Sequence, residues 1–131
     1  MENSNKTIVT VGIVVLVSVI GLMFFAGKVE NGPSKFDGFA QCLKDKGAIF
    51  YGAFWCPHCQ NQKKLFGSSK QYLEYVECST PNGRGQLPVC TERGISTYPT
   101  WVFSDMSTST GEVPLATLAE KTGCTLPTET L

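Results

Sequence analysis

Two cysteines, Cys56 and Cys59, stand two residues apart directly after a continuous apolar run, and this arrangement constrains the fold more than any other feature. The run, residues 48–54, predicts a strand buried on both faces of a sheet. Pro57 follows at a first-turn position, where its missing N–H costs nothing, and a helix is expected from there to about Phe66. The dithiol is therefore predicted at a strand-to-helix junction.

Such a junction favours redox chemistry. Unpaired N–H groups and the positive end of the helix dipole face the first sulfur and stabilise a thiolate there. We therefore expect Cys56 to be the nucleophile and Cys59 to be the resolving thiol. His58 lies between them, and an imidazole that is protonated or donates its N–H stabilises the Cys56 thiolate further. Because stabilising the reduced form makes a disulfide a stronger oxidant, the Pro-His dipeptide favours an oxidase over a reductant.

A zinc site is the main alternative for a Cys-x-x-Cys pair. It needs two further ligands, usually a second such pair or two histidines. The chain has one histidine, which lies inside the motif, and Cys78 and Cys90 do not form a second closely spaced pair. A purely structural disulfide is a weaker alternative, because it would not explain the preceding Trp55 or the helix-initiating Pro57. No metal is therefore expected.

An uncharged apolar segment, residues 8–26, begins close to the N-terminus. About 19 residues at a rise of about 1.5 Å nearly cover a hydrocarbon core of about 30 Å. The end of the segment lacks a small-x-small cleavage site, so we predict an uncleaved transmembrane signal anchor over residues 8–27 rather than a cleaved signal peptide. Residues 1–7 are then a short tail, and residues 28–35, with adjacent Gly and Pro, are a linker.

Charge and cysteine content bear on partners and location. Lys plus Arg equals Asp plus Glu, with 11 residues of each kind, and no basic cluster stands out, so nucleic acid is not expected as a partner. Six cysteines in 131 residues indicate an oxidising compartment. The positive-inside rule is nearly silent here. The cysteines therefore orient this predicted single-pass membrane protein, with its N-terminus in the cytoplasm and its C-terminal domain on the extracytoplasmic side.

The remaining patterns predict one folded domain over residues 36–127, followed by a tail over residues 128–131. Apolar spacing predicts a first helix from Phe36 to about Leu43, with Gly47 as its stop. After the dithiol helix, the predicted elements are a strand over 72–78, helical turns over 89–93, strands over 100–103 and 111–113, and a helix over 115–121. This order implies an α/β fold with a central mixed sheet flanked by helices.

Tyr98 and Pro99 precede the predicted strand over residues 100–103. A proline that opens a strand is often only an edge device. Here it matches the position at which thioredoxin-like folds place a cis-proline against the disulfide. In that arrangement the backbone of Tyr98 pairs with an extended substrate chain, a β-augmentation contact. We expect Trp55, Pro57, Tyr98 and Pro99 to form the substrate-binding surface.

The sequence of residues 50–63, Phe-Tyr-Gly-Ala-Phe-Trp-Cys-Pro-His-Cys-Gln-Asn-Gln-Lys, resembles the thioredoxin-like domain fused behind bacterial vitamin K epoxide reductase (VKOR) homologues. The likeness continues through residues 65–67, 75–78, 90 and 94–101. It covers essentially all of residues 36–127 and implies a thioredoxin-like fold.

In that family the domain passes its disulfide to exported cysteine-containing proteins and is reoxidised by a quinone-linked membrane part. One predicted span cannot supply a four-helix reductase. The resemblance therefore implies a separate VKOR-like membrane oxidase as partner and no cofactor beyond the Cys56–Cys59 disulfide.

One position departs from the wider thioredoxin pattern. Thioredoxins usually carry a buried acid six positions before the first cysteine, which helps to deprotonate the resolving thiol. Here that position is Phe50. Glu74 or Glu77 on the next predicted strand, or simply water, would have to serve instead.

Four cysteines remain, and three pairings are open to them. Cys78 and Cys90 bracket a loop rich in Gly and Pro, and a bridge between them would stabilise the domain by about 3 kcal/mol. The resemblance favours this pair, which leaves Cys42 and Cys124 to join the two ends of the domain. A redox relay through Cys78 and Cys90 is the alternative to a structural role.

Three functions are consistent with these features. The first is an extracytoplasmic disulfide donor. The second is a reductant or isomerase of exported proteins with the same fold. The third is a non-enzymatic module that binds partners or metal through the same thiols. The Pro-His dipeptide and the resemblance favour the first.

Overall fold

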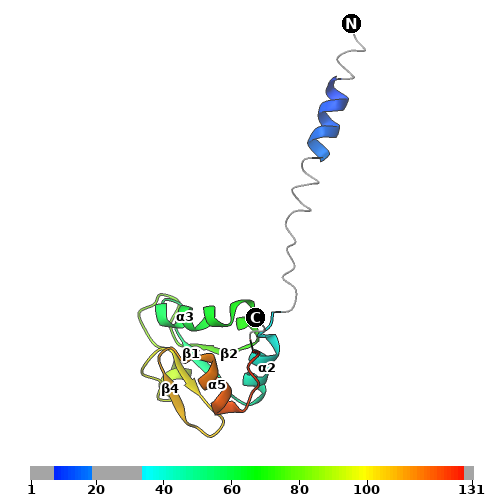
Figure 1. Ribbon diagram of the computed structural model, residues 1–131. Helices are drawn as coiled ribbons and strands as arrows, with labels where there is room; N and C mark the ends of the chain where they lie inside the picture. The colour runs from blue at the N-terminus through cyan, green and yellow to red at the C-terminus, as the bar shows by residue number, and fades with distance from the viewer. Residues whose placement is uncertain (1–7, 19–33, 129–131) are drawn as a thin grey trace. The chain divides into compact units, whose positions relative to one another are not determined.

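The computed structural model describes residues 8–18 and 34–128 (Figure 1). Residues 8–18 form a helix, and residues 34–128 belong to a second, separate unit that forms a folded domain. Neither described segment contains a helix that is long and apolar enough to cross a membrane. The predicted anchor over residues 8–27 lies partly outside the described residues, as does most of the predicted linker.

The domain alternates helices and strands as the sequence predicts. In chain order its elements are α2 (Asp37–Asp45), β1 (Ile49–Gly52), α3 (Pro57–Leu65), the 3-10 helix η1 (Gly67–Tyr72), β2 (Glu74–Glu77), α4 (Pro88–Thr91), β3 (Thr100–Val102), β4 (Thr108–Thr110) and α5 (Leu115–Thr122).

The four strands form one mixed sheet in the order β2-β1-β3-β4. Strand β1 pairs in parallel with β2 and antiparallel with β3, and β3 continues into an antiparallel hairpin with β4. The apolar sequence of β1 fits its surroundings, because Phe50 packs into a core cluster on one face of the sheet and Tyr51 into a second cluster on the other face. The predicted α/β class with a central mixed sheet flanked by helices is confirmed.

The two faces of the sheet carry different cores, because successive side chains of a strand point to opposite faces. On one face Phe50 stacks on Trp101, with ring centroids 4.9 Å apart, in a cluster that includes residues of α2, α3 and α5. On the other face Tyr51 and Val102 pack with Ile95, with Cys78 directly after β2 and with Cys90 in α4. The dithiol belongs to the first, larger cluster.

Both remaining cysteine pairs are disulfides. Cys78 at the end of β2 is bonded to Cys90 in α4, and Cys42 in α2 is bonded to Cys124 after α5, with Cα–Cα distances of 5.6 and 5.9 Å. These are the pairs that the resemblance favours. Cys78 and Cys90 are fully buried, and the choice between a structural role and a relay stays a prediction.

Two strand boundaries lie two residues from their predicted positions. The strand predicted over residues 48–54 ends at Gly52, and Phe54 is half exposed, because the chain turns there and Cys56 N–H donates to Ala53 O. The strand predicted from residue 72 begins at Glu74, since η1 occupies Gly67–Tyr72. Gly67 starts that 3-10 helix with a φ of 57°, a left-handed conformation that favours glycine.

The edge strand begins three residues earlier than the sequence predicts. It lies at Thr108–Thr110 rather than at 111–113, because a tight turn at Met106 reverses the chain and pairs Trp101 with Ser109. Its Thr-Ser-Thr sequence has no apolar alternation, so periodicity gives no signal for it.

Candidate active site

The dithiol lies at the N-terminus of α3, as predicted. Cys56 is the N-cap residue, with an extended backbone, and Pro57 is the first residue of the helix. The backbone N–H of Cys59 donates to Cys56 Sγ at 3.2 Å, and the two sulfurs are 2.7 Å apart. One of the otherwise unpaired N–H groups of the helix therefore points at the first sulfur, where it stabilises negative charge.

The two thiols have different surroundings. Cys59 is fully buried, and burial, followed by its hydrogen bond with Cys56, raises the pKa of the Cys59 thiol to about 12. Cys56 keeps a small exposed fraction, 4%, and is flanked by the half-exposed Phe54 and Trp55. An incoming sulfur therefore reaches Cys56 first, which is what the predicted roles of nucleophile and resolving thiol require.

His58 is exposed and contacts a residue that the sequence did not indicate. Its Nδ1 lies 2.7 Å from Glu112 Oε1, and Asn61 Nδ2 donates to the same oxygen at 3.1 Å. The hydrogen bond with His58, followed by that from Asn61, lowers the pKa of the Glu112 carboxyl. Glu112 lies in the segment before α5, so no local pattern could connect it with the motif. The effect of His58 on Cys56 stays a prediction.

Gln62, one turn after Cys59, is a second residue that the sequence reasoning missed. Its side chain is fully buried and pairs in both directions with the backbone of Val113: Gln62 Nε2 donates to Val113 O at 3.0 Å, and Val113 N–H donates to Gln62 Oε1 at 2.6 Å. These bonds fasten α3 to the segment before α5. The spacing of Gln62 from Cys59 and Phe66, on one buried helix face, was the available signal.

The two glutamates considered as bases for the resolving thiol are both engaged. Glu74 is half exposed and forms an ion pair with Lys44 at 2.9 Å. Glu77 Oε1 accepts from the backbone N–H groups of Phe54 and Ser79, and Glu77 Oε2 accepts from the hydroxyl of Tyr75 at 2.6 Å. Glu77 thus fixes the turn that leads into the dithiol.

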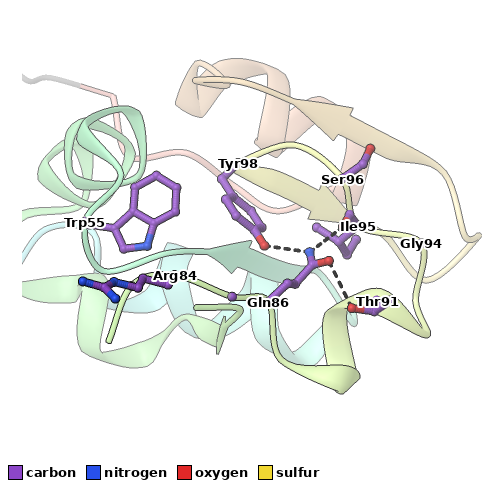
Figure 2. Close-up of a pocket in the computed structure, with 10 residues that line it drawn as sticks. Trp55, Arg84, Gln86, Thr91, Gly94, Ile95, Ser96 and Tyr98 are labelled. Carbon is purple, nitrogen blue, oxygen red and sulfur yellow. Dashed lines mark hydrogen bonds between the residues drawn. The ribbon is translucent and has the colours of Figure 1, made fainter. Parts of the chain in front are cut away.

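A groove of about 580 Å³ adjoins the dithiol loop, and Figure 2 shows the residues that line it. Trp55 and Tyr98 lie edge to face, with ring centroids 6.1 Å apart. Gln86 holds Tyr98 in place, because Gln86 Nε2 donates hydrogen bonds to the Tyr98 hydroxyl and to Ile95 O. Trp55 Nε1 in turn donates to Ser79 Oγ at 2.8 Å.

The predicted substrate-binding residues are partly brought together. Trp55 and Tyr98 line the groove, whereas Pro57, which is exposed, and Pro99, which is fully buried, are not among its lining residues. The Tyr98–Pro99 peptide bond is cis. Contact of these residues with a substrate stays a prediction.

Metal ligands are scarce in this arrangement. Four of the six cysteines are in disulfides, and the described residues contain no group of three or more His, Cys, Asp or Glu side chains that could hold a metal ion.

Comparison with known proteins adds an independent observation. The chain is 39% identical over 112 residues to the thiol-disulfide oxidoreductase LTO1 of Arabidopsis thaliana. The chain is a homologue of LTO1. The alignment covers 82% of this chain and 30% of LTO1, so the chain spans about 30% of the length of that relative. No family model matches the chain.

Homology to LTO1 confirms the resemblance that the sequence indicated, because the part of LTO1 that matches is its thioredoxin-like module. The name of LTO1 states the chemistry that the Cys56–Cys59 geometry allows, the exchange of thiols and disulfides.

Proposed function

We propose that this chain is a thiol–disulfide oxidoreductase that donates the Cys56–Cys59 disulfide to exported cysteine-containing proteins. The observation that carries the proposal is the position of Cys56 Sγ, which lies at the N-terminus of α3, 3.2 Å from the Cys59 backbone nitrogen and 2.7 Å from Cys59 Sγ. In the donor reaction a substrate thiolate attacks Cys56 Sγ and Cys59 leaves. A second substrate thiolate then attacks the substrate sulfur of the mixed disulfide and releases Cys56.

The redox state that the site stabilises supports the donor direction. A thiolate at Cys56 gains the N–H bond from Cys59 and the positive end of the α3 dipole, and both favour the reduced form. A disulfide whose reduced form is stabilised is a stronger oxidant. The homology to LTO1 supports a role in a disulfide relay.

One observation favours the alternative of a reductant or isomerase. The carboxylate of Glu112 lies 2.7 Å from His58 Nδ1 and offsets the positive charge that His58 could offer to Cys56. A weaker positive field at Cys56 would make the disulfide less oxidising.

A redox titration of the full chain against glutathione or dithiothreitol separates the two directions. We expect a potential above about −200 mV, near that of protein disulfide isomerase or higher. A potential near about −270 mV, the value of thioredoxin, would instead identify a reductant.

We further propose that residues 8–27 anchor the chain in a membrane, with the N-terminus in the cytoplasm and the domain on the extracytoplasmic side. The proposed partner that reoxidises it is a VKOR-like, quinone-linked membrane oxidase. Protease added to intact cells or vesicles should digest the domain only from the extracytoplasmic side. Depletion of the oxidase should leave Cys56 and Cys59 reduced, which alkylation and gel mobility would detect.

A further inference from the structure

A basic side chain lies beside the buried resolving thiol. Lys63 follows Cys59 by one helical turn, so both side chains project from the same side of α3. Lys63 Nζ stands 3.4 Å from the centroid of the Tyr75 ring and 6.0 Å from that of the Phe50 ring. Phe50 is the position at which thioredoxins carry their buried acid, and here it contributes an aromatic face to this cation.

Gly52 shows how closely the thiol and the aromatic ring approach each other. A Cβ atom at this position would lie 3.1 Å from Cys59 Sγ and 3.1 Å from Tyr75 Cε2. Both atoms therefore converge on the same bare α-carbon of β1. The ring that holds the Lys63 ammonium thus also borders the resolving sulfur.

The other end of the cluster is fixed by hydrogen bonds. The Tyr75 hydroxyl donates to Glu77 Oε2, and Glu77 Oε1 accepts from the N–H groups of Phe54 and Ser79. Both carboxylate oxygens of Glu77 thus accept hydrogen bonds, and the charge of Glu77 raises the pKa of Lys63. Burial, followed by the bond to Glu77, raises the pKa of Tyr75, so its phenol stays neutral.

We propose that Lys63 is a positioning residue for the exchange step of Cys59: its ammonium, held on Tyr75 beside the sulfur, stabilises the Cys59 thiolate. This inference rests on the proposed oxidoreductase function but not on its direction. In disulfide donation Cys59 is the leaving thiolate when a substrate attacks Cys56. In reduction Cys59 gives its proton to solvent, attacks Cys56 Sγ, forms the Cys56–Cys59 bond and expels the substrate as a thiolate. The negative charge resides on the same sulfur in both cases.

The charges around this sulfur favour Lys63 as the group that acts on it. The titratable groups that interact with this sulfur are Cys56 at the N-cap of α3, Lys63 on α3 and Tyr75 on β2. Lys63 in turn interacts with Glu77 on β2 and with Lys70 on η1. Burial is the largest cause that raises the pKa of Cys59, and the charge of Lys63 opposes it. Burial also lowers the pKa of Lys63.

The test uses the full chain, reduced and mixed with Ellman's reagent, which releases one thionitrobenzoate when Cys56 attacks and a second when Cys59 resolves the mixed disulfide. We expect Lys63→Met to leave the first phase within about twofold of wild type. The second phase should slow at least about threefold, since one unit of thiol pKa changes the thiolate fraction tenfold and nucleophilicity offsets about half of that on a logarithmic scale. Its pH profile should shift to higher pH, and Lys63→Arg should restore most of the rate.

Lys64→Met is the matched control, because it removes an equal charge from the adjacent, exposed position of α3. It should change neither phase. Lys63→Gln repeats the test should Lys63→Met fold poorly, as judged by thermal unfolding. The inference is overturned if the second phase of Lys63→Met or Lys63→Gln matches wild type, or slows without a shift in its pH profile. No release from the wild-type chain would instead refute the proposed function itself.

Discussion

The buried amide of Gln62 offers the most direct test of how α3 is held in place. Replacing Gln62 with Met keeps the length and approximate volume of the side chain but removes both hydrogen bonds to Val113. Val113 is buried, with an exposed fraction of 5%, so its N–H and C=O would be left without partners away from water. Each buried unsatisfied group costs about 1–3 kcal/mol. The expected loss in the free energy of unfolding is therefore about 2–6 kcal/mol.

The measurement is equilibrium unfolding of the oxidised full chain in urea, followed by circular dichroism in a mild detergent. For a small domain the slope is about 1–3 kcal/mol per molar urea, so the midpoint should fall by about 1 M or more. Gln60→Met is the matched control: Gln60 lies on the same helix, but its single bond, to Phe54 O at 2.9 Å, is exposed and water can replace it. That variant should change stability by less than about 0.5 kcal/mol.

The reasoning is refuted if Gln62→Met unfolds within about 0.5 kcal/mol of wild type, or if Gln60→Met loses as much. Equal losses would mean that removing any side-chain amide from α3 destabilises the domain, and that the two hydrogen bonds between Gln62 and Val113 contribute no more than the exposed one of Gln60. Redox activity should survive in folded Gln62→Met protein, since Gln62 touches neither sulfur through any bond that the structure describes.

Three further outcomes follow from the site. Cys59→Ser should trap substrates as mixed disulfides on Cys56, seen as reductant-sensitive bands on gels. Cys56→Ser should trap few substrates, because Cys59 is fully buried. Equal trapping by the two variants would contradict the assigned roles. His58→Ala should lower the redox potential, because it removes a positive charge that stabilises the Cys56 thiolate. The expected decrease is about 5–20 mV, since a pair of charges at the surface contributes about 0.2–1 kcal/mol and about 30 mV corresponds to 1.4 kcal/mol. Glu112→Gln should raise it by freeing His58, and a shift of the same sign in both variants would contradict this account. The reduced chain should lose stability as pH rises from about 8.5 towards 12: the folded state keeps the Cys59 proton, with a pKa of about 12, after the unfolded state has released it. The oxidised chain lacks this thiol, so its urea midpoint should fall less over the same range, and parallel curves would exclude the linkage.

Much of the fold was determined by local sequence patterns. The apolar run, the two cysteines and Pro57 predicted the strand-to-helix junction, because strand burial and first-turn proline are properties of neighbouring residues. The order of helices and strands followed from the same kind of signal. The exceptions, η1 and the polar edge strand Thr108–Thr110, carry no apolar periodicity that sequence reasoning could use.

The chemistry of the site shows the same division. The sequence by itself predicted the two redox sulfurs and that a helix N-terminus faces the first of them, since residues 56–59 carry this information locally. Only the tertiary structure decided that Glu112 meets His58, that Val113 meets Gln62 and that Tyr75 holds Lys63 beside Cys59. The physical reason is that these partners come from other elements. Which ones meet depends on how α3 packs against the sheet and against the segment before α5, and neither contact leaves a pattern along the chain.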